Sequence, residues 1–134
     1  MIQRIQTIYL FLLGIFSFAV LWMPFQVNRD GQVQSLIDFP LISIFSILIG
    51  GCSILTIFLF FKRTIQIKLI WAMLALCFLE GYMLFNNYLI AQNYKTGFFR
   101  YIFIVPILQF ILLILSQWKI YQDERLVKDS DRLR

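Results

Sequence analysis

A single carboxylate, Glu80, lies near the centre of an apolar stretch that runs from residue 69 to residue 90. Elsewhere the chain keeps its charged side chains between or beyond its hydrophobic segments. An acid inside lipid must pair, form hydrogen bonds or carry a proton, because a low dielectric disfavours its charged form. Glu80 is therefore the first residue to consider for function.

Two neutral residues are candidates to share a midplane site with Glu80. At 1.5 Å per residue, Glu80 lies about 16 Å from the inner end of its segment, and Gln109, Ser17 and Gly50 fall within a few ångströms of that depth. Asn87 stands two turns further along the same face. Such a layer can bind a proton or cation, or it can fix helix pairing through a protonated acid that bonds to Gln109. The second interpretation is favoured, because the chain has no His and no second acid or base in the interior of the spans, where Arg100 stands only at the outer edge of the fourth.

The chain offers little for catalysis or for metal binding. It contains no His for a triad, and no G-x-S-x-G, P-loop or H-E-x-x-H motif. Cys52 and Cys77 are expected to act as small apolar fillers, because no CxxC motif or carboxylate pair accompanies them. We expect no enzymatic activity, no catalytic residue, no cofactor and no metal.

The composition is that of a membrane protein. Of the 134 residues, 60% are hydrophobic and 14% are charged, whereas soluble domains have roughly 45–50% and about 25%. Four runs are long enough to span a bilayer as helices, which takes about 20 apolar residues. They are residues 7–25, 40–61, 69–90 and 98–118. The sequence thus predicts an all-α integral membrane domain over residues 1–118.

Short connections force consecutive helices to lie antiparallel, so we expect an up-down four-helix transmembrane bundle. Positive residues fix the orientation through their excess in cytoplasmic loops. With a cytoplasmic N-terminus, nine lie inside (Arg4, Lys62, Arg63, Lys68, Lys119, Arg125, Lys128, Arg132, Arg134) and three outside (Arg29, Lys95, Arg100). Both termini are therefore predicted to be cytoplasmic, with the first span uncleaved.

A stripe of small residues follows one face of the second span: Ser43, Ser46, Gly50 and Ser53. Small side chains let membrane helices approach closely. Packing inside the bundle is the favoured interpretation, and docking of a foreign helix is the alternative. Pro106, inside the fourth span, lacks a backbone donor and predicts a kink.

Residues 119–134 form a charged cytoplasmic tail with five basic and four acidic side chains. The mixture does not resemble a polybasic lipid-binding run. Glu124 and Lys128 have the favourable i,i+4 order, so the fourth helix can extend into the cytoplasm. A solvated tail and a docking peptide for a partner are both open.

The two ends of the chain carry a family resemblance. Residues 1–10 (MIQRIQTIYL), 123–128 (DERLVK) and 131–134 (DRLR) are similar to the opening and closing signatures of domain of unknown function 4293, a bacterial family of small four-span membrane proteins. The resemblance implies the bacterial inner membrane and no established activity. It directs attention to the cytoplasmic ends, where Arg4 is expected near Asp131, Arg132 and Arg134 as a surface for partner docking.

Two functions remain. The preferred one is a non-enzymatic accessory or scaffold subunit that binds a larger membrane or cytosolic assembly. The alternative is a small transporter or channel component that uses a midplane site of Glu80, Asn87 and Gln109. The expected partners are the lipid bilayer and other membrane or cytosolic proteins, with no nucleic acid, and homo-oligomerisation is left open.

Overall fold

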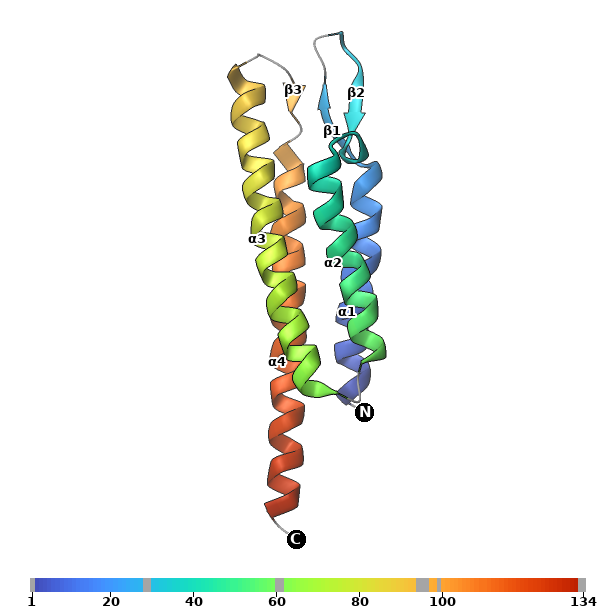
Figure 1. Cartoon of the computed structure of the whole chain (residues 1–134), viewed down its shortest axis with the longest axis vertical. Helices are drawn as coiled ribbons and strands as arrows, with labels where there is room; N and C mark the ends of the chain where they lie inside the picture. The colour runs from blue at the N-terminus through green and yellow to red at the C-terminus, as the bar shows by residue number, and fades with distance from the viewer. Residues whose placement is uncertain (1, 28–29, 60–61, 94–96, 99, 133–134) are drawn as a thin grey trace.

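A computed structural model describes the backbone of residues 2–27, 30–59, 62–93, 97–98 and 100–132, and the side chains of residues 5–27, 30–59, 62, 64–91, 101–122 and 125. Its elements form a bundle with a small sheet at one end (Figure 1). The helices are α1 (Ile2–Ala19), α2 (Pro40–Phe58), α3 (Arg63–Asn93) and α4 (Ile104–Arg132). Each is long and apolar enough to cross a membrane, so the predicted four-helix bundle is confirmed and the chain is a multi-pass membrane protein.

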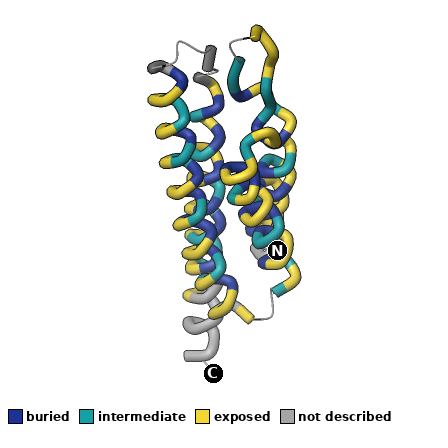
Figure 2. The backbone as a smooth tube through the Cα atoms, turned by 45° about the horizontal axis from the view of Figure 1, so that its top comes forward, coloured by how far each residue is buried: buried dark blue, intermediate teal, exposed yellow. Residues whose placement is uncertain are grey.

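Consecutive helices run in alternate directions, and α1 also packs against α4 to close the ring (Figure 1). Figure 2 shows buried residues along the inner faces of the helices and exposed residues on the outside. The exposed positions are largely apolar, as lipid requires, and include Phe11, Leu55 and Phe78. The helices thus bury one stripe against each other and present a second apolar surface to the bilayer.

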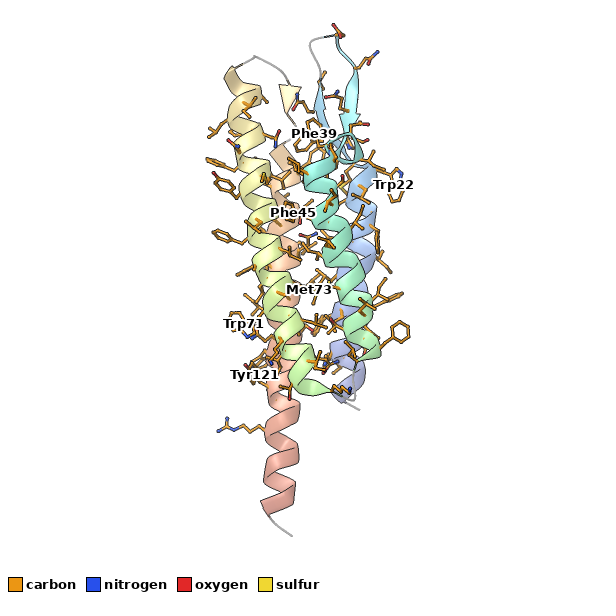
Figure 3. All side chains as sticks on the ribbon, viewed as in Figure 1. Trp22, Phe39, Phe45, Trp71, Met73 and Tyr121 are labelled. Carbon is orange, nitrogen blue, oxygen red and sulfur yellow. The ribbon has the colours of Figure 1, made fainter. Side chains whose placement is uncertain are left out.

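Aromatic side chains mark the two ends of the spans. Trp22 and Trp71 point away from the bundle while Met73 points into it (Figure 3). Trp71 lies toward the end with the chain termini, where Lys119 also stands 4.8 Å above the Trp118 ring. Amphipathic rings favour the headgroup region, so these positions agree with the boundaries expected from hydropathy.

The small sheet joins two loops that are far apart in the sequence. Its strands are β1 (Pro24–Val27), β2 (Val33–Ser35) and β3 (Gly97–Phe98), in the antiparallel order β2-β1-β3. This sheet was not predicted from the sequence. Between β1 and β2, Gly31 has a φ of 77°, a conformation that glycine adopts without the strain of a side chain.

The start of α2 follows the residue types. Pro40 is the first residue of the helix, where its missing N–H removes no intrahelical bond. Just before it, the Ser35 backbone N–H and hydroxyl donate to Asp38 at 2.8 and 3.1 Å. The first of these bonds, together with the Asp38 backbone N–H donating to the Ser35 side chain, forms a capping box around the short 3₁₀ helix Leu36–Asp38.

The expected kink at Pro106 is replaced by a helix start. A 3₁₀ helix, Arg100–Phe103, leads into α4, which begins at Ile104 and holds Pro106 in its first turn. An N–H in the first turn has no intrahelical acceptor, so proline is tolerated there. At the other end, α4 continues without a break to Arg132 and extends alone beyond the other three helices (Figure 1).

Candidate functional site

The candidate site is a layer of polar side chains across the middle of the bundle. Each helix contributes one residue that is 0% exposed: Ser17 from α1, Ser46 from α2, Glu80 from α3 and Gln109 from α4. Apolar clusters lie on both sides of the layer. One includes Leu13, Ile49, Met73 and Leu113. The other includes Val20, Ile42, Leu84 and Val105. Each helix thus passes from one apolar cluster, through its polar residue, into the other.

One of the two carboxyl oxygens of Glu80 accepts a hydrogen bond. The Ser46 hydroxyl donates to Glu80 Oε1. Among the residues that the structure describes, Glu80 Oε2 has no hydrogen-bond partner. The Gln109 side chain lies beside the carboxyl group, but no hydrogen bond of ordinary geometry joins the two in the described part of the chain. The layer therefore contains one carboxyl oxygen that is buried and unpartnered.

Gln109 connects the layer to α1 and to a second point on α3. Its Nε2 donates to Ser17 Oγ at 3.2 Å. Its Oε1 lies 3.7 Å from Cys77 Sγ, which also approaches the Pro106 carbonyl oxygen at 3.2 Å. Cys77 stands one turn before Glu80 on α3, so the amide oxygen of Gln109 is turned toward the helix that carries the carboxyl group.

Asn87 does not join this layer. It is half-buried, and its Nδ2 donates to the Met83 carbonyl oxygen of its own helix at 2.9 Å. The three midplane residues predicted from sequence are thus divided, with Glu80 and Gln109 together and Asn87 apart. Counting depth along the helices predicted Gly50 as the member of the layer from α2, whereas the structure has Ser46 there.

The stripe of small residues faces the interior of the bundle. Ser43, Ser46, Gly50 and Ser53 are all buried. A Cβ atom built on Gly50 would lie 3.0 Å from the Phe18 ring of α1, and one on Gly14 would lie 2.8 Å from Ser53 Oγ. The stripe therefore brings α1 close to α2, and its residues are not accessible to a foreign helix.

Sequence reasoning missed a second polar contact, nearer the end that carries the chain termini. Gln6 Nε2 donates to Gln66 Oε1 at 3.3 Å, and Gln66 Nε2 donates to the Thr56 carbonyl oxygen at 2.9 Å. This contact ties α1, α2 and α3 together. The signal for it was weak, because glutamines near the ends of spans are as compatible with the membrane interface as with a buried pair.

An apolar groove of about 500 Å³ lies between α3 and α4. Aromatic side chains line much of it, including Phe78, Tyr82, Phe85 and Phe110. Gly81 and Pro106 also line it, and a Cβ on Gly81 would be 3.6 Å from Pro106 Cβ. A groove of this character accommodates hydrocarbon, and it gives Glu80 no polar path to water.

The remaining predicted residues give little chemistry. Within the described part of the chain, no group of three His, Cys, Asp or Glu side chains could hold a metal ion. Cys52 and Cys77 are free thiols. The predicted docking residues lie outside the described side chains: Arg4, Asp131, Arg132 and Arg134.

Comparison with known proteins gives a family and no activity. No curated protein and no solved structure matches the chain. The model of one family matches residues 2–133, which is nearly the whole chain. With its four apolar helices and the terminal signatures that resemble that family, the protein belongs to the family described as domain of unknown function 4293.

Proposed function

We propose that the protein is a non-enzymatic membrane scaffold, an accessory subunit that binds a larger membrane or cytosolic assembly through the extension of α4. The observation that carries this proposal is the continuity of α4 from Ile104 to Arg132. Its apolar window ends at Gln122, and the helix continues for about three further turns. That part extends beyond the bundle, away from the other helices (Figure 1).

A short isolated helix is marginal in water, because the first turn is costly to form. The α4 extension avoids that cost, since it propagates from a helix that the bundle already holds: Ile120 is buried against the core. The sequence places Glu124 and Lys128 in the i,i+4 order that favours a helix. The chain thus presents a preformed helix of mixed charge, which can bind a partner with a smaller ordering cost than a disordered tail would pay.

The interior supports a scaffold over a transporter. A transport site must reach water during its cycle, whereas Glu80, Gln109, Ser17 and Ser46 are all 0% exposed. The α3–α4 groove is apolar and opens on the lipid-facing surface. In the described structure, Ser46 bonds to Glu80 and Gln109 bonds to Ser17, so these buried polar residues link neighbouring helices and serve the packing of the bundle.

Deletion of residues 123–134 tests the proposal. We expect the full-length tagged protein, extracted in mild detergent, to bring a stoichiometric partner that mass spectrometry identifies, and the deletion to lower its recovery at least about tenfold, equivalent to 1.4 kcal/mol of binding. The bundle should survive, because the deletion begins beyond Ile120, which is buried against the core.

A charge-swapped variant, E124K with K128E, is the matched control. It keeps the net charge and the i,i+4 pair but reverses the pattern that a partner would read. Loss of the partner in both variants supports recognition of charge on the helix. An identical set of bound proteins in full-length and truncated samples would refute docking through α4.

We also propose that both termini lie in the cytoplasm, in the inner membrane of a bacterium. The start of α1 and the end of α4 lie at the same end of the bundle, opposite the sheet (Figure 1). With that end inside, the cytoplasmic side carries nine Lys and Arg against three outside. The resemblance at both chain ends, now supported by family membership, favours the same assignment.

Labelling with a membrane-impermeant maleimide tests the orientation. We expect Gln32→Cys, in the exposed hairpin, to react in intact cells, and Ser130→Cys to react only after the membrane is opened. The native thiols give a low background, because Cys77 is buried and Cys52 half-buried within the spans. The reverse pattern of labelling would invert the proposed topology.

A further inference from the structure

We propose that Glu80 is a proton-binding site: its carboxyl group is protonated on Oε2 and donates to the Gln109 amide oxygen, which completes one hydrogen-bonded layer through Ser46, Glu80, Gln109 and Ser17. The inference goes beyond the scaffold proposal and is independent of any partner. It rests on the surroundings of the two carboxyl oxygens and on the direction of the hydrogen bonds in the layer.

The surroundings of Glu80 offer no counter-charge. The sequence contains no Lys, Arg or His in residues 5–28, 30–61, 69–94 or 101–118, which include the central part of each span, and the basic residues within the spans, Lys68 and Lys119, lie near their ends. The groups that face the carboxyl group from the other helices, Ser17, Ser46 and Gln109, do not titrate. Cys77, on its own helix, is the neighbouring titratable side chain. A carboxylate in this position would be a buried charge without a partner, which is costly in a low dielectric.

The direction of the bonds identifies where the proton lies. Ser46 already donates to Oε1, so Oε1 is the carbonyl oxygen of the acid. Oε2 is then the hydroxyl oxygen, and as an acceptor it has no partner among the described residues. Gln109 uses Nε2 on Ser17, and its Oε1 is turned toward α3. An O–H on Oε2 can donate to this amide oxygen, and both carboxyl oxygens of Glu80 then have a partner.

The hydrogen bonds of the layer then link all four helices, and donation runs the same way around the bundle at each step. A proton on Glu80 lets donors run from α2 to α3, from α3 to α4 and from α4 to α1. Apolar clusters enclose this chain of bonds on both sides. Such a layer fixes both the depth and the rotation of each helix, because a shift by one residue would leave buried groups unpaired.

Carbon-13 spectroscopy of the glutamates tests the proposal directly. The chain contains two glutamates, Glu80 and Glu124, so protein labelled at glutamate Cδ and reconstituted in vesicles gives two side-chain signals. At neutral pH we expect one signal at the position of a protonated acid and one at that of a carboxylate. E80Q should remove the first, and E124Q should remove the second.

Infrared spectra of the same samples report the bond from Ser46. A hydrogen bond to a carbonyl lowers its stretching frequency, so S46A should raise the frequency of the protonated carboxyl band without abolishing it. S43A is the matched control, because Ser43 donates to carbonyl oxygens of its own segment, Phe39 and Pro40. Two carboxylate signals at neutral pH, or a carboxyl band that is indifferent to S46A, would overturn the proposal. The wild-type spectrum decides the first point even if a variant fails to fold.

Discussion

Replacing Gly50 with leucine is expected to destabilise the bundle by about 2 kcal/mol or more relative to the same replacement at Gly51, because overpacking a close-packed contact typically costs 1–3 kcal/mol. A Cβ on Gly50 would lie 3.0–3.3 Å from three ring atoms of Phe18. Leucine adds three more carbons in a space that Phe18 already occupies. The two helices would have to separate, and the close approach at Gly14 and Ser53 would be lost with them.

Gly51 provides the control on the same helix. A Cβ there would meet nothing within 4 Å, so leucine can extend into lipid and gains up to about 1 kcal/mol of helix propensity over glycine. Unfolding in mixed micelles, followed by the fluorescence of Trp22, Trp71 and Trp118, measures both variants. Equal stability of the two would show that the α1–α2 contact is looser than these distances indicate.

The four helices were predictable because hydropathy alone decides them. In a bilayer every backbone polar group must be satisfied within its own segment, so a run of about 20 apolar residues has one stable form. The expected ends were less accurate: the third run was placed at 69–90, whereas α3 extends over Arg63–Asn93. Helix ends depend on capping and on loop contacts, which hydropathy does not report.

The sheet could not be predicted in the same way. The turn between β1 and β2 has a local sequence signal, because Asp30-Gly31 is a dipeptide typical of turns. The pairing of β1 with β3, in contrast, joins Val27 to Gly97 and Gln26 to Phe98. These strands have two to four residues each, which is too short for a period-2 pattern to stand out. Only the bundle, by placing two loops at the same end, brings the strands together.

The depth of the polar layer was predicted from the sequence, but the rotation of the helices about their axes was not. Counting residues along straight helices correctly placed Ser17, Glu80 and Gln109 at one level, because the rise per residue is constant. Which side chain of α2 meets Glu80 depends on how that helix turns about its axis. Contacts such as Gly50 with Phe18 set this rotation, so Ser46 became the partner. Asn87, on α3, bonds with its own helix.

Replacing Glu80 separates the insertion of the chain from its packing. A central acid such as Asp opposes insertion of a helix by roughly 2.5–3.5 kcal/mol. Glu80→Ala should therefore insert at least as well as the wild type. The inserted bundle should nevertheless lose about 2–4 kcal/mol of stability, because the Ser46 hydroxyl and the Gln109 amide lose a partner and a cavity remains.

Glu80→Gln should keep stability within about 1 kcal/mol of the wild type, since an amide, like a protonated acid, offers both a donor and a carbonyl acceptor. Asn87→Ala is the control for loss of a polar side chain from the same helix, because Asn87 bonds only within α3 in the described structure. Stability must be measured on the inserted protein, by reversible unfolding in bicelles, because expression yield mixes insertion with packing. If Glu80→Ala proved as stable as Glu80→Gln, the carboxyl group would contribute nothing to packing. An acid at this depth would then be better explained by a function of its charged form or by proton exchange.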